Sequence, residues 1–541
     1  MAARGGAHPG LGRGVNLDDL ASGQPLDLAI IGGGINGCAI AEEAAARGLR
    51  VALFEATDFG FGTTWRSTKL IHGGLRYLEH GDVRLVFESL RERAWLLKTR
   101  PYLVTPQRFL LPMLPWTRRP AWQLRAGLAT YDMLALYRGV PSHRRLGRER
   151  LRAMAPYLPE PANGGFSFFD ARVHSPERLT LELALSAESV GASIHNHTAV
   201  TRIAEEAGQV AAVEVSWEGQ SFTIAARAVV NAAGPWVDAV NQLDDLPPPE
   251  LLGVTRGTHI VVDLDRPPGH NAVFSTAKSD GRVFFAVPQG DLLLIGTTDE
   301  RYDGEPSEIR PVDSDIEYLV AEARELLPGY DITRSRICYA YAGLRPLQKV
   351  KGGPEAAISR RHAVLDHGEL GGARGVYSVV GGKLSTFRPL AEEVVARLDP
   401  PRKRARHTDQ PPAGWRESLL ESGLPKPSLR HLRVYGAAIP GVLALGREVL
   451  CEHSGAIAGE VRHAMRNEHV TTLADIMLRR TGISWAACRG LCCHRRIAAI
   501  AAEEAGWSSD QVTDQVRAFE EEVAYHLPTE ESLAADHFAA G

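Results

Sequence analysis

Hydrophobic and polar positions follow different periods along this chain of 541 residues. Near the N-terminus, the apolar run LDLAII at 26–31 stops at three glycines, which predicts a short buried strand. The segment NGCAIAEEAAARG at 36–48 has the composition of a helix that ends at Gly48, and RVALFE at 50–55 predicts a second strand. The first part of the chain therefore predicts a β-α-β unit.

The middle of the chain mixes helical and strand patterns. An amphipathic helix leading into a strand is predicted at 173–194, and 226–236 predicts a buried strand that ends in a Gly-Pro turn. The segment RVFFAVPQGDLLLIGTTD at 282–299 predicts two antiparallel strands joined at 288–291. Strand, glycine turn and helix follow one another again at 375–398.

The ends of the chain have a different character. The first 24 residues are rich in glycine and lack the apolar core of a secretory signal, so we expect a disordered tail. Four prolines and a basic cluster at 399–415 predict a linker, and a mainly helical region follows it. There, Thr472 and Asp475 have the spacing of a capping box at a helix start. No apolar run is long enough to cross a bilayer.

Composition narrows the classes of function. An apolar content of 44% and a charged content of 23% are typical of a soluble globular protein, and the net charge of −4 argues against nucleic acid as the main partner. Six scattered cysteines indicate reduced thiols rather than a disulfide framework. The segment CRGLCCH at 488–494 lacks a second spaced ligand pair, so we expect packed helix cysteines and no metal.

The β-α-β unit carries a dinucleotide signature. Gly32, Gly34 and Gly37 form G-x-G-x-x-G between the first strand and the helix, where backbone N–H groups can approach a pyrophosphate. Glu55 ends the second strand, where a carboxylate can accept both hydroxyls of an adenosine ribose and would repel a 2′-phosphate. A glycine-rich turn without a ligand is the alternative, and the ordered context of strand, helix and terminal acid argues against it.

The setting of this unit favours FAD over NAD. The second strand is followed by a polar stretch, TTWRSTKLIHGGLRY at 63–77, and the strands that complete the sheet return only at 226–234 and 375–380. We therefore predict an α/β protein with a discontinuous Rossmann-like FAD-binding domain, an inserted substrate domain with a mixed or antiparallel sheet, and an all-α C-terminal domain. The boundaries are 25–100, 221–250 and 335–398 for FAD, 101–220 and 251–334 for substrate, and 416–541 for the helices.

The sequence resembles the FAD-dependent, aerobic-type glycerol-3-phosphate dehydrogenases, within the D-amino-acid-oxidase-like flavoproteins. The resemblance covers 26–398, with a weaker echo in EHVTTLADIMLRRTGI, and the family's usual residues differ at Ala39, Glu43 and Phe387. The strings that carry it occur in the family's order: IGGGINGCAIAEEAAARG, STKLIHGGLRYLEHGDVRLVFESLRER, VVNAAGPWVD, RGTHIVV, IGTTDE, AGLRPL and VVGGKLSTFRPLAEE.

The implied substrate, sn-glycerol 3-phosphate, is a dianion with a secondary alcohol. The resemblance assigns Arg76, Tyr77 and Arg345 to its phosphate, because a guanidinium can bind two phosphate oxygens at once. Thr297 and, more weakly, Arg360 are added to this set. Each arginine taken singly is as compatible with a solvated ion pair. Arg76 and Arg345 gain weight because each lies next to a Gly or Pro turn after an apolar segment, as in a loop that enters a cleft.

Oxidation of the alcohol needs a base and a positive charge near the flavin. His259 is our first candidate for the base because imidazole titrates near neutral pH, and a hydrogen-bonded strand histidine is an equal alternative. Lys383, after a glycine pair at a predicted helix start, can present its ammonium to the flavin or substrate. Together with Arg345 these form the predicted catalytic set.

The remaining predicted cofactor contacts follow the motifs of the resemblance. The stretch at 63–68 is expected along the diphosphate and ribityl chain, and 69–74 beneath the flavin ring. In full, beyond the glycines and Glu55, the set is Thr64, Ser67, Thr68, Lys69, His72, Gly73, Gly74, Ala233, Gly234, Gly382, Lys383, Leu384 and Ser385.

The family implies transfer of two electrons to a membrane quinone by an enzyme at the cytoplasmic face of the membrane. The segment at 108–139 suits either a membrane-facing element or an amphipathic helix pair. Three rival functions stay open: an oxidase that makes peroxide, an enzyme for amino or hydroxy acids, and a non-catalytic flavoprotein sensor. The oligomeric state is also open, with a homodimer as one option.

Overall fold

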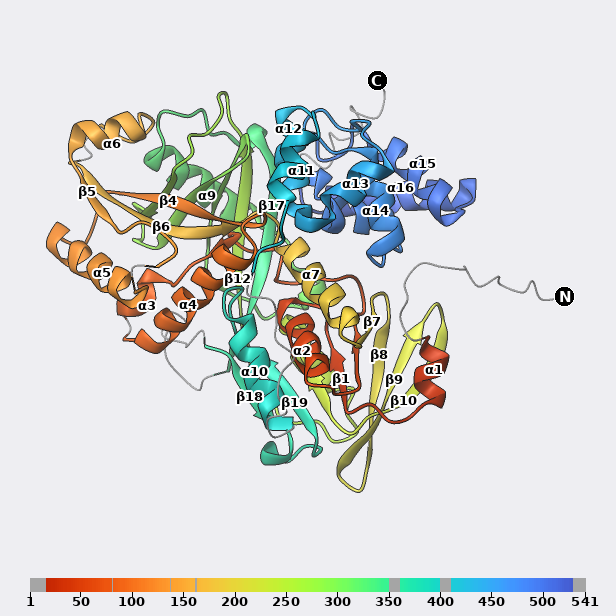
Figure 1. The fold of residues 1–541 in the computed structure, drawn as a ribbon. Coiled ribbons are helices and arrows are strands. Elements are labelled where there is room, and N and C mark those ends of the chain that lie inside the picture. Colours follow the sequence, from red (N-terminus) through yellow and green to blue (C-terminus); the bar gives the residue numbers. More distant parts are fainter. Residues whose placement is uncertain are drawn as a thin grey trace.

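The computed structural model describes residues 16–79, 81–136, 138–160, 163–349, 361–398 and 410–528, and Figure 1 shows their arrangement. A six-stranded and a ten-stranded sheet make up most of the molecule, and the C-terminal helices gather at one end. The chain passes between the two large sheets several times, so neither sheet is built from one continuous segment.

The six-stranded sheet contains the predicted β-α-β unit. Its order is β18-β19-β11-β1-β2-β7, with all neighbours parallel except the antiparallel pair β18 and β19. The strands are β1 (Leu28–Ile31), β2 (Val51–Phe54), β7 (Ser193–His195), β11 (Val229–Asn231), β18 (Ala363–Asp366) and β19 (Val376–Val380). The prediction that strands near 226–234 and 375–380 return to complete this sheet is confirmed. The domain boundaries drawn from it stay predictions.

Alternate residues of β1 and β2 pack on opposite faces of this sheet. Leu28 and Ile30 share a core with three helices, α2 (Ile35–Ala46), α7 (Pro176–Ser189) and α10 (Phe387–Leu398). Ala29 and Ile31 pack instead on a three-stranded antiparallel sheet of β8 (Ala199–Glu206), β9 (Gln209–Trp217) and β10 (Gln220–Ala225). Both faces of the six-stranded sheet are therefore buried, which explains why the sequences of β1 and β2 are continuous apolar runs.

The expected disordered tail is wrong for its last part. Residues 17–22 form helix α1 (Leu17–Ser22), which the Asn16 side chain caps by accepting a hydrogen bond from Asp18 N. Leu17 and Leu20 are buried against the three-stranded sheet. These two side chains give the segment enough apolar burial to fold. Residues 1–15 lie outside the described part.

The ten-stranded sheet has the order β16-β12-β15-β14-β13-β4-β6-β3, with β17 paired to β12 and β5 to β6. Helix α9 (Asp313–Leu326) covers one face, where Ile260 and Ile295 are buried, and Val261 and Leu294 point to the other face. The strands are β3 (Leu70–Ile71), β4 (Val104–Pro112), β5 (Arg144–Leu146), β6 (Gly165–Val173), β12 (Leu252–Asp263), β13 (Ala272–Thr276), β14 (Val283–Gln289), β15 (Leu292–Gly296), β16 (Glu300–Arg301) and β17 (Ile337–Gln348). The predicted strand pair at 282–299 is β14 and β15.

Helices α3 (Leu75–Glu79), α4 (Val83–Thr99), α5 (Ala121–Leu134) and α6 (Arg148–Met154) lie beside this sheet (Figure 1). Of the helix pair considered for 108–139, one helix is present as α5, but residues 108–112 belong to strand β4. Residues 104–112 pair with β6 along their whole length. Phe109 and Leu111 pack in the core on one face of the sheet, and Leu110 between them packs in the core on the other face. The short helix α8 (Val237–Asn241) follows β11.

The C-terminal region is helical, as predicted. It contains α11 (Trp415–Glu421), α12 (Lys426–Leu432), α13 (Ile439–Leu445), α14 (Ala458–Asn467), a π-helical turn (Asp475–Arg480), α15 (His494–Ala505) and α16 (Ser509–Ala524). The capping box is confirmed, since Asp475 N donates to Thr472 Oγ1 at 3.1 Å and Thr472 N donates to the Asp475 carboxylate at 2.9 Å.

Buried ion pairs join this helical region to the six-stranded sheet. Asp58, which follows β2, accepts hydrogen bonds from Arg479 at 2.8 Å and from Arg480 at 2.7 and 2.8 Å. On α7, Arg178 pairs with Glu468 at 2.5 Å. All five side chains are buried, so separating the two regions would strand charges in the interior.

None of the described helices is long and apolar enough to cross a membrane.

Candidate functional site

The turn between β1 and α2 forms a cradle with no room for side chains. A Cβ atom on Gly37 would lie 1.9 Å from the carbonyl oxygen of Gly32, and Gly32 has a φ of +108°. Gly34 begins α2 without a side-chain cap, although Thr64 Oγ1 accepts a hydrogen bond from Ile35 N at 3.2 Å. The helix N-terminus is thus kept close to the backbone turn, where backbone N–H groups favour an anion.

Glu55 closes the far side of this cradle. Its carboxylate accepts hydrogen bonds from Gly33 N at 2.6 Å and from Thr57 N at 2.8 Å. Burial raises the pKa of Glu55, and these backbone bonds oppose that rise. The predicted ribose acceptor therefore stands at the end of β2, beside the glycines, as the spacing indicates. Ala233 and Gly234 line the neighbouring turn after β11, where Gly32 approaches Ala232.

A cavity of about 400 Å³ lies against the ten-stranded sheet. Loops after β2 and β19, together with β12, β14 and β17, provide its walls. The structure brings together in this cavity the following residues predicted from the sequence: Ser67, Thr68, His72, Gly74, Tyr77, His259, Thr297, Arg345, Gly382, Lys383, Leu384 and Ser385. These residues come from segments up to about 300 positions apart.

Arg345 lies inside strand β17, opposite Thr255 of β12, and the loop position expected for it is wrong. Its Nη1 donates to Asp299 Oδ1 at 2.9 Å, and its Nη2 donates to Thr297 Oγ1 at 3.2 Å. A Cβ on Gly257 would clash with the guanidinium, so that glycine makes room for it. The arginine predicted to bind phosphate is therefore held in a fixed direction by a carboxylate and a hydroxyl.

His259 lies on β12, deep in the same cavity. Its Nε2 is 2.9 Å from Thr68 Oγ1, and its ring stacks on Tyr341 with the ring centroids 5.1 Å apart. The buried Nδ1 has no hydrogen-bond partner among the described residues. Burial, followed by the charges of Arg345 and Lys69, lowers the pKa of His259 to about 3. The imidazole is therefore neutral at pH 7 in the protein without ligands.

Lys383 follows Gly381 and Gly382 in the turn after β19. Helix α10 begins four residues later, at Phe387, so the expectation that Lys383 starts the helix is wrong. Its ammonium lies 3.8 Å from the centroid of the Tyr77 ring and 3.4 Å from Ser89 Oγ on α4. The lysine thus reaches across the cavity toward helices α3 and α4.

Some predicted residues lie elsewhere. The ammonium of Lys69 forms a buried ion pair with Glu177 on α7 at 3.1 Å and lies over the ring of Trp485, so it does not line the cavity. Gly73 is behind the cavity wall, where a Cβ would meet Leu90 at 2.7 Å. Arg76 belongs to α3, and its side chain is not described. Arg360 lies outside the described residues.

Sequence reasoning missed four charged residues that line the cavity: Arg66, Asp82, Arg282 and Asp299. Arg66 is buried against Phe61 and Trp65, and burial lowers its pKa to about 10. Asp299 pairs with Arg345, and Arg282 pairs with Glu300 at 2.9 Å on the same rim. Arg66 lies in the polar stretch at 63–77, and Asp299 lies in the motif IGTTDE. Both could have been predicted from the site residues next to them in these motifs.

A buried network holds the glycine loop in place. The hydroxyl of Tyr131 on α5 accepts a hydrogen bond from Gly73 N at 2.8 Å and donates to the carboxylate of Asp170. Asp170 pairs in turn with Arg93 at 2.5 Å. Tyr131 and Arg93 are almost fully buried, so this network fixes the loop that carries His72 and Gly74.

Two family models match this chain, one over the part that contains the two large sheets and one over most of the C-terminal helical region. Residues 27–387 match the FAD dependent oxidoreductase family, and residues 371–512 match the C-terminal domain of alpha-glycerophosphate oxidase. The chain belongs to the FAD-dependent oxidoreductases. The glycine cradle, the uncapped N-terminus of α2 and Glu55 fit FAD as its cofactor. Within that class, the chain is a member of the FAD-dependent glycerol-3-phosphate dehydrogenase and oxidase family.

Individual relatives cover nearly the whole chain. A glycerol-3-phosphate dehydrogenase from Synechocystis is 35% identical over 92% of this chain and 96% of its own length. A D-erythritol 1-phosphate dehydrogenase from Brucella abortus is also 35% identical, over 85% of this chain and 95% of its own length. The crystal structure of the Bacillus halodurans glycerol-3-phosphate dehydrogenase with FAD has a TM-score of 0.74 at 28% identity and covers 95% of this chain and 97% of its own.

Proposed function

We propose that the protein oxidises sn-glycerol 3-phosphate to dihydroxyacetone phosphate and that its electrons pass to a membrane quinone. The observation that carries the proposal is the meeting of Arg345, Thr297 and Lys383 with a neutral histidine in one cavity of about 400 Å³. Two fixed cations suit a small dianion, and the histidine suits a proton acceptor. FAD, when bound, supplies the hydride acceptor.

Arg345 is proposed to bind the substrate phosphate. Its guanidinium forms hydrogen bonds with Asp299, Thr297 and the carbonyl oxygen of Thr298, and this arrangement fixes the direction of the fork. Thr297 would add a hydroxyl to the same phosphate, and Lys383 would add a second positive charge from the other wall. A carboxylate substrate needs only one such clamp, so the pair of cations favours phosphate over an amino or hydroxy acid.

His259 is proposed to accept the proton of the substrate hydroxyl. Nδ1 is buried without accessible surface, so the proton would go to Nε2, which contacts the hydroxyl of the cavity residue Thr68. The charge of Arg345 is one cause of the lowered pKa of His259. A phosphate dianion on Arg345 would offset that charge and raise the pKa of His259, so substrate binding itself would make the imidazole a better base.

Exposed apolar side chains on α4, on α5 and just after α5 support the proposed membrane contact. Trp122 is 73% exposed, Met133 56% and Leu136 51%, and Phe87 on α4 is 41% exposed. Helix α4 also carries Ser89, which contacts Lys383 in the cavity. Apolar side chains exposed beside the reaction site suit a surface that lies on lipid and receives a quinone.

Anaerobic flavin reduction tests the proposal. Loss of the oxidised-flavin absorption on adding sn-glycerol 3-phosphate, but not glycerol or lactate, is the expected result. Because the Brucella relative is a D-erythritol 1-phosphate dehydrogenase, D-erythritol 1-phosphate is the second substrate to test. If it reduces the flavin faster than sn-glycerol 3-phosphate does, the preferred substrate is a four-carbon polyol phosphate. An unchanged flavin spectrum with both phosphates, in protein that retains FAD, would refute the enzyme function and favour a sensor.

The electron acceptor needs a separate assay. Reoxidation of the reduced enzyme by a soluble quinone analogue, without peroxide, is expected for a dehydrogenase. Rapid reoxidation by O₂ with one peroxide formed per substrate would instead identify an oxidase, and it would refute the quinone part of the proposal alone.

A further inference from the structure

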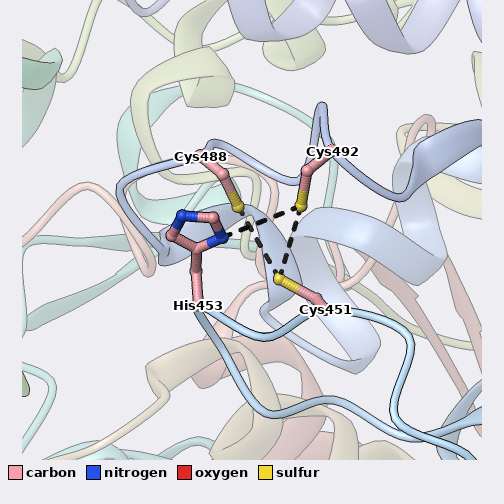
Figure 2. Close-up of side chains that lie close together, drawn as sticks. All are labelled: Cys451, His453, Cys488 and Cys492. Atoms are coloured by element: carbon pink, nitrogen blue, oxygen red, sulfur yellow. Dashed lines mark hydrogen bonds between the residues drawn. The ribbon is translucent and has the colours of Figure 1, made fainter.

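Four side chains with metal-binding atoms converge on the surface of the C-terminal region (Figure 2). Cys451 and His453 lie on the loop between α13 and α14, and Cys488 and Cys492 lie in the turns before α15. The expectation that the latter two are helix cysteines is wrong. The second ligand pair that the segment at 488–494 lacks in sequence is supplied by the Cys-x-His motif at 451–453.

The spacing of these atoms fits one tetrahedral ion. Cys451 Sγ lies 3.7 Å from the Sγ atoms of both Cys488 and Cys492, and Cys492 Sγ lies 4.0 Å from His453 Nδ1. All four ligand atoms lie within 4.8 Å of one another. With metal–sulfur distances of about 2.3 Å, the edge of a tetrahedron is ~3.8 Å. A disulfide, by contrast, would bring two sulfurs to about 2.05 Å.

We propose that these four residues bind a single Zn²⁺ ion as a closed Cys₃His site. Three thiolates and one imidazole are the ligand set that zinc prefers, and four protein ligands leave no position for a substrate. The small spread of the ligand atoms leaves room for one ion rather than a two-iron cluster. Binding converts the thiols to thiolates and releases their protons to solvent. His453 and Cys492 are exposed, so the ion has an open route to the site.

The site would stabilise the C-terminal region. It joins two loops about 35 residues apart, and Cys451 of one and Cys488 of the other pack on the same core as Ile497. The segment just before Cys488 carries Trp485, whose ring packs on Trp65 at 5.3 Å and lies 4.3 Å from the ammonium of Lys69. The proposed zinc thus fixes the segment that contacts the polar stretch at 63–77.

Another cluster shows why ligand-type residues alone are not sufficient. Asp58, His197 and Asp475 also lie within 4.8 Å of one another, but arginines already occupy their carboxylates. Asp58 binds Arg479 and Arg480, and Asp475 binds Arg479 at 3.0 Å. Two neighbouring guanidinium groups would repel a cation. Among the described residues, no arginine or lysine forms an ion pair with the ligand atoms of the cysteine cluster, so that cluster favours a cation where this one does not.

Metal analysis of the purified, FAD-loaded protein tests the proposal. One zinc per chain is expected, with Cys451→Ser and Cys488→Ser losing most of the metal while retaining FAD. Cys338→Ser, in β17, and Cys493→Ser, next to the site but bonded to Gly490 O at 3.4 Å, are the matched controls and should keep the zinc. Iron with acid-labile sulfide, or no metal, would overturn the proposal. Zinc lost from Cys493→Ser but not from Cys492→Ser would overturn the ligand assignment.

Replacing the metal in the wild-type protein tests the same proposal if the cysteine variants do not fold. Removing zinc with a chelator should lower the thermal midpoint by several degrees, and adding Co²⁺ should restore it and produce the visible bands of tetrahedral cobalt thiolate beyond the flavin absorption. A midpoint unaffected by the chelator together with no cobalt bands would contradict the site. Both readouts are independent of catalysis, so the inference stands or falls separately from the proposed enzyme activity.

Discussion

Arg345 tests the phosphate part of the proposed function at the scale of one residue. Arg345→Ala removes the guanidinium that Asp299 and Thr297 orient. We expect kcat/KM for sn-glycerol 3-phosphate to fall roughly 30- to 1000-fold, which corresponds to a loss of about 2–4 kcal/mol of transition-state stabilisation. The fall should come mainly from a higher KM, while FAD stays bound. Steady-state kinetics and the ratio of flavin to protein absorbance give the two measurements.

Arg301→Ala is a matched control for this prediction. Arg301 lies on β16 in the same sheet, but its side chain is 62% exposed and pairs only with the exposed Asp303. It should leave both kinetics and FAD content unchanged. Loss of FAD from Arg345→Ala, with unchanged KM in the remaining holoenzyme, would show that Arg345 belongs to the cofactor and not to the substrate.

Tyr131 offers a residue-scale test of the loop at Gly73. Tyr131→Phe leaves Gly73 N without its acceptor and removes one hydrogen bond to Asp170 in a buried setting. We expect the free energy of unfolding to fall by about 1–3 kcal/mol, measured as a lower thermal midpoint. Tyr318→Phe, whose hydroxyl donates to the exposed Asp280, should have little effect. Equal effects in the two variants would argue against the network.

Individual side chains show how far sequence reasoning about the site can reach. Thr68, His259 and Arg345 were predicted from motifs, and the structure does bring them into one cavity. Lys69 belongs to the same motif, but its ammonium pairs with Glu177, and no local pattern reveals a partner 108 positions away. Cys451 was missed for the same reason, since a ligand set completed across 37 positions depends on tertiary packing.

At the scale of one element, Gly37 ties helix α2 to the strand before it. Gly37→Ala places a methyl group 1.9 Å from the Gly32 oxygen, which the backbone must move to accommodate. We expect the purified variant to lose FAD, shown by a low ratio of flavin to protein absorbance. Gly127→Ala in α5, where a methyl group meets nothing within 4 Å, should keep FAD and gain about 0.5–1 kcal/mol. Full FAD content in Gly37→Ala would refute the role of the cradle.

Elements with a strong local pattern were predicted well. The β-α-β unit, the hairpin of β14 and β15, and the capping box at Thr472 follow from apolar runs, turn residues and cap chemistry. The failures have a physical cause in each case. Strand β4 was not predicted as a strand because its long apolar run has no clear period, and α1 was missed because only burial of Leu17 and Leu20 stabilises so short a helix.

At the scale of the whole molecule, His526 lies where the C-terminal helices meet the polar stretch at 63–77. Its ring packs on Trp65 at 5.0 Å, and burial, followed by Arg66, Arg479 and Arg310, lowers its pKa to about 3. The unfolded chain therefore binds a proton on this group below its ordinary pKa of about 6.5, and the folded protein does not. Its share of the stability is complete above that pH and is lost as pH falls toward 3.

His526→Gln tests this assignment through pH dependence. Between pH 5.5 and 4, the wild type should lose stability more steeply than the variant, with a difference in slope that approaches about 1.4 kcal/mol per pH unit. Urea unfolding midpoints at several pH values measure the difference in slope, which a general loss of packing would not change. Parallel slopes in the two proteins would show that the imidazole is accessible to protons in the folded state.

The order of strands in the six-stranded sheet also bears on how the protein is made. β1 and β2 leave the ribosome early, but their neighbour β11 begins at Val229, and β19 begins only at Val376. At ~5–20 residues per second, roughly 15 to 65 s separate synthesis of β2 from that of β19. In the first part of that interval, until β11 is synthesised, one edge of β1 has no partner strand, and afterwards the free edge is that of β11 until β19 follows. The nascent chain must therefore avoid aggregation at an open sheet edge until most of the polypeptide has been synthesised.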